Sequence, residues 1–66
     1  MPAVKILEVL GTSTESWSDA AAEAVKEAHK SVRKMTGVEV IAQAAKVKDG
    51  AIVEFHTTCK IAFRVE

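Results

Sequence analysis

The chain has 66 residues, of which 48 % are hydrophobic and 27 % charged, a composition typical of one small globular domain. Nine Lys and Arg residues balance nine Asp and Glu residues, so the formal net charge is zero. A balanced charge argues against a partner held mainly by charge, whether nucleic acid or an anionic membrane surface. We therefore interpret residues 1–66 as a single domain with no nucleic-acid or membrane partner.

A chain this short buries little apolar surface and needs a further source of stability, such as disulfides, a metal or self-association. Cys59 is the single cysteine, so an internal disulfide is excluded. Cys59, His29 and His56 are too few for a closed zinc site. Self-association remains, and we predict a homo-oligomer.

The N-terminal residues lack the charged segment and the apolar segment that together mark a secretory signal. No apolar run reaches the length that spans a bilayer. We expect a cytoplasmic location.

Residues 3–10 are rich in Val, Ile and Leu and predict a strand that is partly covered on both faces. Residues 11–13, Gly-Thr-Ser, predict a turn. Ser13 or Ser16 is expected to cap the helix that follows, and Ser16 has Asp19 three residues later, as in a capping box.

Apolar residues then recur at spacings of three and four and predict a helix of about five turns. The stripe consists of Trp17, Ala21, Ala24, Val25, Ala28, Val32 and Met35. The Ala residues near its start keep the helix slim, so that a sheet can approach closely. Gly37 is expected to end the helix as a left-handed cap.

Residues 38–48 predict a second strand, and Asp49-Gly50 predicts a tight hairpin to a third. From 53 to 65, mostly apolar residues alternate with mostly polar ones, which places Cys59 on the apolar face and His56 on the polar face. The predicted fold class is α+β, a β-α-β-β chain with a three-stranded antiparallel sheet wrapped on one helix. Apolar groups on the second face of the sheet are left for partner chains.

Three segments in this order resemble the dodecin family. They are Leu-Gly-Thr-Ser at 10–13, followed by Trp17 and the Ala-rich helix; Val-Glu-Val at 38–40; and Ile-Ala-Phe-Arg-Val-Glu at 61–66. The resemblance covers essentially the whole chain. It implies assembly into a hollow homododecamer, which in flavin-binding members holds stacked flavins at two-fold interfaces.

The resemblance also assigns positions. The flavin-stacking Trp of the family falls at Gly37, beside Val38, and the Gln that bonds the flavin ring falls at His56. Polar ligand contacts of the family fall at Ala42 and Ala44. Gly37, Val38 and His56 are therefore the cofactor-binding positions, but the aromatic platform is missing. The resemblance leaves flavin as a weakened cofactor, beside calcium or another cation, because some branches are described as calcium-binding dodecins.

Several residues carry two interpretations. Trp17 either packs in the core or an interface or serves as a ligand platform. His56 is either a pocket group that forms hydrogen bonds and titrates near neutral pH, or an ordinary interfacial residue. Cys59 is expected to be a buried, inert thiol, and His29 a surface residue.

The carboxylates Glu8, Glu39, Asp49 and Glu54 are scattered and show neither acid–base nor EF-hand spacing. One Glu per subunit would become a ring at a symmetry axis and could hold a cation there. The sequence does not identify the metal ligands.

The leading hypothesis is an oligomeric binding and storage protein that sequesters a small molecule or ion where subunits meet. The alternatives are binding and storage of riboflavin or FMN in an altered pose, and a purely structural shell. The chain contains no nucleophile–base pair, metal cluster or phosphate loop, so we do not expect an enzyme.

Overall fold

The computed structural model describes residues 3–65; Met1, Pro2 and Glu66, the last residue of the C-terminal motif, lie outside the described residues. The elements are β1 (Ala3–Ser13), α1 (Trp17–His29), β2 (Met35–Lys48) and β3 (Ala51–Val65). The predicted order β-α-β-β is confirmed.

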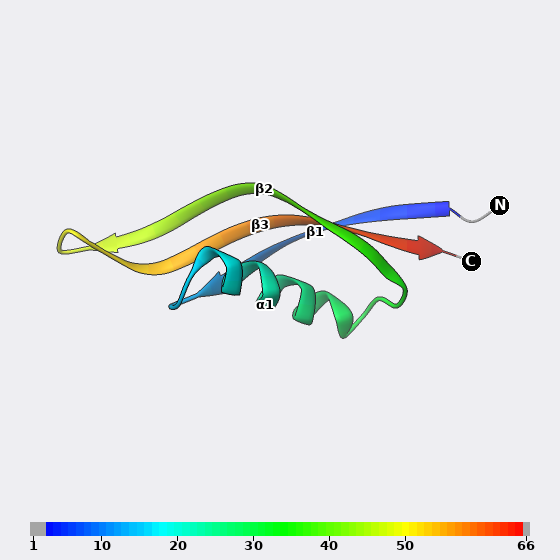
Figure 1. The fold of residues 1–66 in the computed structure, drawn as a ribbon, viewed down its shortest axis with the longest axis horizontal. Coiled ribbons are helices and arrows are strands. Elements are labelled where there is room, and N and C mark those ends of the chain that lie inside the picture. Colours follow the sequence, from blue (N-terminus) through cyan, green and yellow to red (C-terminus); the bar gives the residue numbers. More distant parts are fainter. Residues whose placement is uncertain (1–2, 66) are drawn as a thin grey trace.

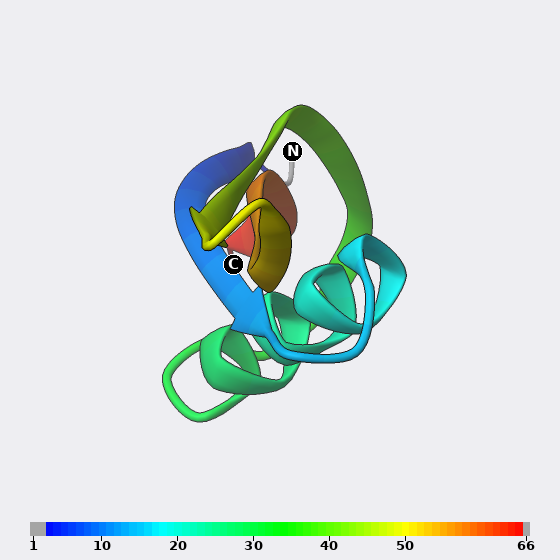
Figure 2. The same ribbon diagram turned by 90° about the vertical axis from the view of Figure 1, so that its left-hand side faces the viewer.

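The three strands form one sheet in the order β1-β3-β2, and β3 runs antiparallel to both neighbours. Helix α1 lies along one face of this sheet, which we call the helix side; the other is the open side (Figure 1). Seen end-on, the twisted strands curve above the helix (Figure 2). The predicted sheet wrapped on one helix is confirmed.

The core lies between β3 and α1 and is built mostly from small side chains. On β3, Thr57, Cys59 and Ile61 are buried, as the alternation predicts. They meet a row of three Ala residues spaced four apart on α1, Ala20, Ala24 and Ala28. The buried Thr57 hydroxyl donates a hydrogen bond to the Trp17 carbonyl oxygen at 2.9 Å, which offsets its desolvation.

The helix begins as the capping pattern predicts. Ser16 is the N-cap, and its hydroxyl accepts a hydrogen bond from the Asp19 backbone N–H at 2.9 Å. Ser13 contributes too, because its hydroxyl donates to the Asp19 carboxylate at 2.7 Å. Both serines that the sequence singled out therefore stabilise this end of the helix.

The predicted turn at residues 11–13 is wrong, because these residues extend β1 and pair with residues 55–57 of β3. Gly11 is required for another reason. A Cβ built there would overlap the carbonyl oxygen of Ala20, so only glycine lets α1 lie this close to the strand.

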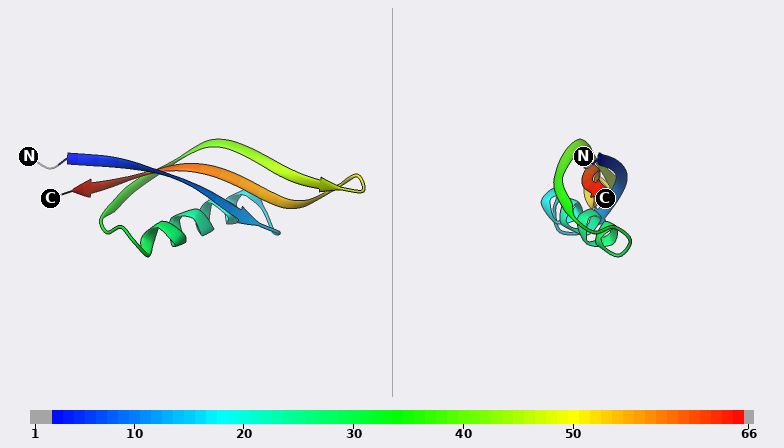
Figure 3. Two further views of the ribbon diagram at one scale, coloured as in Figure 1. Left: turned by 180° about the vertical axis from the view of Figure 1, so that it is seen from behind. Right: turned by 90° about the vertical axis from the view of Figure 1, so that its right-hand side faces the viewer.

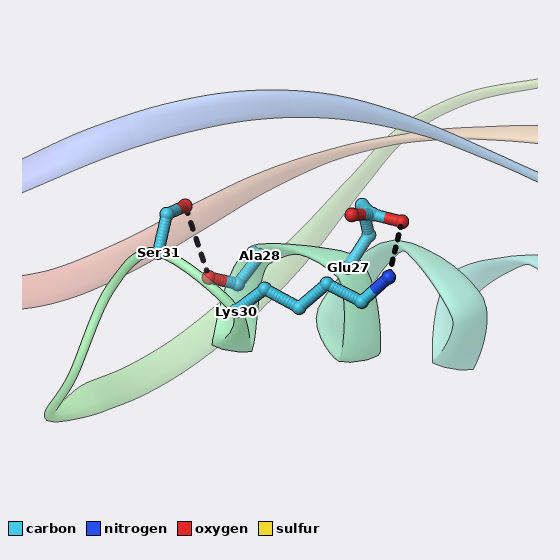
Figure 4. Close-up of polar contacts among 4 residues, drawn as sticks. All are labelled: Glu27, Ala28, Lys30 and Ser31. Atoms are coloured by element: carbon cyan, nitrogen blue, oxygen red, sulfur yellow. Dashed lines mark hydrogen bonds and ion pairs between the residues drawn. The ribbon is translucent and has the colours of Figure 1, made fainter.

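The helix is shorter than predicted and ends at His29. The backbone N–H groups of Ser31 and Val32 both donate to the Ala28 carbonyl oxygen at 3.0 Å, and the Ser31 hydroxyl lies 3.4 Å from the same atom. Figure 4 shows this turn beside the exposed Lys30–Glu27 ion pair. The Ser31 bonds compete with continued helix and close the last turn.

The left-handed cap at Gly37 is therefore also wrong. The positive φ in this segment belongs to Lys34, at 58°, and Gly37 lies within β2 opposite Ala62. Val32 and Met35 still pack against the core, but from the connection and from β2.

The predicted hairpin is confirmed. Asp49 and Gly50 have φ of 54° and 79°, and they join Lys48 to its partner Ala51 in a two-residue turn. Seen from behind, this end of the β2–β3 pair projects past the start of α1 and past the end of β1 (Figure 3).

Candidate ligand-binding site around Gly37 and His56

A concavity of about 310 Å³ lies on the helix side, where the first part of β2 passes α1. It is lined by Val25, Met35, Gly37, Val38 and Ile61. The lining side chains are aliphatic or thioether groups, and none carries a charge. The concavity can therefore hold the apolar part of a ligand and supplies no charged partner.

Gly37 lines this concavity without a side chain. A Cβ built on Gly37 would meet no atom within 4 Å, so the position has room for a larger side chain. The resemblance places a stacking Trp at this position, where the structure has a glycine at the edge of an aliphatic concavity. The neighbouring Val38 pairs with Ile61 and is 51 % exposed, so part of the lining is available for contact.

His56 lies on the open side of the sheet, where its ring Nε2 is 2.7 Å from Oε1 of Glu54. This hydrogen bond, the charge interaction with His56 and the nearby Lys46 lower the pKa of Glu54 below its usual 4.5. Partial burial opposes the shift. Lys46 is the direct cross-strand partner of Glu54, so the three side chains form a polar group at one end of the sheet.

Within one chain, Gly37 and His56 do not form a common pocket. Gly37 pairs with Ala62, and His56 pairs with Ala44, six residues further along β3 from Ala62. Six residues of strand span about 20 Å. A site that uses both residues requires two copies of the chain, and the assignment of Gly37, Val38 and His56 to one ligand stays a prediction.

Trp17 packs inside the chain. Its ring meets Phe55 edge-on, with centroids 4.7 Å apart, and its Nε1–H donates to the Ala44 carbonyl oxygen at 3.0 Å. These contacts support the packing interpretation, because the polar end of the indole already has a partner. Ala42 and Ala44 are opposite Thr58 and His56, and they bring no polar side chain to the open side.

The remaining candidates do not form a reactive site. Cys59 is buried, and desolvation raises the pKa of its thiol, as expected for an inert cysteine. His29 is exposed at the end of α1.

The register reveals a charged row that the sequence reading missed. Glu8 on β1 and Glu39 on β2 are both direct partners of Lys60 in the central strand. Only the strand order β1-β3-β2 shows this, because the three residues are far apart in sequence. Residues 3–65 contain no group of three or more His, Cys, Asp or Glu side chains placed to hold a metal.

The sequence also does not predict that the residues lining the concavity come together. The sequence indicates that Val25 and Ile61 are apolar but predicts Met35 within the helix, so it gives no sign that these three residues line one concavity with Gly37. The signal that could have located it is Ser31, a residue that ends helices more readily than it continues them.

Within residues 3–65, helix α1 lacks the length and apolar character required to cross a membrane.

A family model for dodecin matches residues 3–66. The chain is 32 % identical over 65 residues to the calcium dodecin of Mycobacterium tuberculosis, covering 98 % of this chain and 92 % of that relative. Among solved structures, dodecin from Streptomyces coelicolor is 29 % identical with a TM-score of 0.94, covering 98 % and 93 % of the two chains. The calcium-chelating calcium dodecin from M. tuberculosis, described with a novel calcium-binding site, is 34 % identical with a TM-score of 0.83, covering 97 % and 91 %.

Fold and matches together define the class, a small chain with the β-α-β-β architecture of the dodecins. The chain belongs to the dodecin family.

Proposed function

We propose that this chain is the subunit of a hollow homododecamer that binds and stores a small molecule or ion where its copies meet. Family membership supports the assembly, and so does the small core of one copy. The observation that carries the ligand proposal is the aliphatic concavity beside Gly37. This concavity could hold the apolar part of a ligand, and no aromatic side chain lines it.

The residues present do not fit a stacked flavin. Stacking on an aromatic ring contributes about 0.5–1.5 kcal/mol beyond the area it buries, and Gly37 supplies no ring. Trp17 does not replace it, because its ring is engaged by Phe55 and Ala44. We expect riboflavin to bind weakly or not at all.

Calcium is the second candidate, and one relative at 32 % identity is a calcium dodecin. Glu8 and Glu39 lie on the open side of the sheet, one on either side of Lys60, and carboxylate oxygens are the ligands that Ca²⁺ prefers. A site built from one such carboxylate per copy would exist only in the assembled protein.

The test combines native mass, riboflavin titration and calcium titration on the purified protein. We expect a mass near twelve subunits and little quenching of riboflavin fluorescence. Gly37→Trp together with His56→Gln should tighten riboflavin binding by at least tenfold, about 1.4 kcal/mol. Gly37 has no positive φ, so this Trp introduces no left-handed strain.

Gly37→Leu with His56→Gln is the matched control, since it adds an apolar side chain at the same position without an aromatic face. Equal tightening by Leu and Trp would contradict the stacking argument. Tight riboflavin binding by the unmodified chain would favour flavin storage in an altered pose. An assembled protein that binds neither riboflavin nor calcium would favour a purely structural shell.

A further inference from the structure

A second concavity, of about 330 Å³, lies where the connection between α1 and β2 passes the last residues of β3. The described residues that line it are Ser31, Val32, Arg33, Lys34, Phe63, Arg64 and Val65. Three of these residues are basic and none is acidic. We call it the basic concavity, because its lining offers positive charge to a ligand beside apolar side chains.

Backbone hydrogen bonds hold the lining of the basic concavity in place. The Arg64 N–H donates to the Lys34 carbonyl oxygen at 3.1 Å, which ties the connection to β3. At the start of the connection, the N–H groups of Ser31 and Val32 donate to the Ala28 carbonyl oxygen at 3.0 Å. Figure 4 shows the Ser31 side chain directed at the same oxygen. These donors occupy a carbonyl group at the negative end of α1, which would otherwise oppose an anion nearby.

The basic concavity lies next to the aliphatic concavity beside Gly37. Lys34 lines the basic concavity, and Met35, the next residue, lines the aliphatic one. Met35 is also the direct cross-strand partner of Phe63 in the basic concavity. On β3, Phe63 follows Ile61 of the aliphatic concavity at about 7 Å, and both point to the helix side. Apolar side chains therefore continue from one concavity into the other.

The two concavities differ in chemistry and complement each other. The aliphatic concavity has no charged lining, whereas the basic one has cations, and Lys5 pairs with Phe63 on the same face of the sheet. Their volumes, about 310 and 330 Å³, are each close to the lower limit of about 300 Å³ for small-molecule pockets. A ligand that occupies both would have ample room, with its charged part paired and its apolar part away from water.

We propose that the two concavities form one site for an amphipathic anion, a carboxylate on an aliphatic chain. The carboxylate binds beside Arg33, Lys34 and Arg64, since a guanidinium group can donate two parallel hydrogen bonds to carboxylate oxygens. The aliphatic chain passes Phe63 and Met35 into the aliphatic concavity. The inference rests on the proposed function, whose ligand concavity it uses, and it names the class of ligand.

The test is calorimetric titration of the purified protein with octanoate, and with octanol and acetate as probes that carry only the chain or only the charge. We expect octanoate to bind at least tenfold more tightly than either probe. Arg33→Gln with Arg64→Gln should weaken octanoate binding at least tenfold and leave octanol binding unchanged. Lys26→Gln with Lys48→Gln is the matched control, because it removes two positive charges outside both linings and should not change octanoate binding.

Lys34→Gly keeps the test decisive if the double Arg variant fails to fold. Lys34 has a left-handed φ of 58°, a conformation that favours glycine, so this substitution removes a charge without straining the backbone. It should retain the wild-type circular dichroism and weaken octanoate binding at least threefold.

Equal affinities for octanoate and octanol would overturn the inference, because the basic concavity would then take no part in binding. Equal affinities for octanoate and acetate would overturn it as well, since the aliphatic concavity would then contribute nothing. No octanoate binding by a protein with a native mass near twelve subunits would overturn this inference and leave the proposed assembly intact. A folded monomer that binds octanoate would overturn the proposed assembly and support this site.

Discussion

Replacing Gly11 with Ala probes the closest approach between α1 and the sheet. The new Cβ would overlap the Ala20 carbonyl oxygen, and it would lie 2.9 Å from the Ala24 backbone nitrogen. Both obstructing atoms belong to the helix backbone, so no side-chain rotation relieves the contact. The helix must move away from β1, and the row of buried Ala residues moves with it.

The cost follows from the size of the core. Forcing one methyl group into a well-packed core typically costs about 1–3 kcal/mol. Here the displaced helix carries Ala20, Ala24 and Ala28, half of the buried side chains within residues 3–65, so we expect the upper part of this range. A loss of ~1 kcal/mol lowers the Tm of a domain of this size by about 4–8 °C.

Thermal unfolding followed by circular dichroism, at equal chain concentration for every variant, measures this cost. Gly37→Ala is the matched control, because its Cβ meets nothing within 4 Å and its φ is not left-handed. We expect that control to be neutral, or more stable by about 0.4–1 kcal/mol through the unfolded chain. Equal Tm values for Gly11→Ala and wild type would show that α1 does not lie against β1 in the way described.

Two further predictions concern polar contacts. Ser16→Ala removes the acceptor of the Asp19 N–H and should lower the free energy of unfolding, measured with a chemical denaturant, by about 1 kcal/mol. Ser18→Ala, also near the helix start, is the control and should leave this free energy almost unchanged. Equal effects of the two substitutions would contradict the assignment of Ser16 as the N-cap. An NMR pH titration should give a Glu54 pKa below 4.5 that rises towards this value in His56→Ala. Because the pKa of Glu54 is lower in the folded than in the unfolded chain, Glu54 contributes stability above about pH 4.5 that is lost as the pH falls through the folded pKa. An identical Glu54 titration midpoint in wild type and in His56→Ala would refute the interaction between Glu54 and His56.

The strands were predictable because their signals are local. The alternation in β3 needs only the rule that neighbouring side chains point to opposite faces, and it correctly placed Thr57, Cys59 and Ile61 inside. The Asp49-Gly50 turn follows from backbone sterics alone. The helix end was not predictable from the apolar spacing, because Val32 and Met35 reach the same core after the helix has ended.

The two glycines Gly11 and Gly37 also show that a local pattern can predict the wrong structure. The sequence predicts a turn at the glycine between the first strand and the helix, and a helix cap at the glycine that follows the helix. In the structure Gly11 permits close packing, and Gly37 is an ordinary strand residue beside an open concavity. The sequence contains the glycine, but only the fold decides whether backbone conformation or lack of a side chain is what matters.

The candidate site was predictable only as positions. The resemblance named Gly37 and His56, and the register puts them about 20 Å apart along β3. No pattern in one chain can show how two copies bring such positions together. The pairing of Glu8 and Glu39 with Lys60 was hidden for a related reason, since it depends on strand order.

The distribution of side chains connects this fold to binding between copies. Ala, Thr and Cys occupy most of the interior, while Val4, Ile6 and Val47 are each about 60 % exposed. Burying such side chains between copies would add hydrophobic stability that a single copy does not have, so we expect assembly and folding to be coupled. A ligand held between copies binds only the assembled state, and by mass action it stabilises the fold of every chain that contributes to its site. Its removal should therefore lower the unfolding temperature and shift the assembly towards smaller species together.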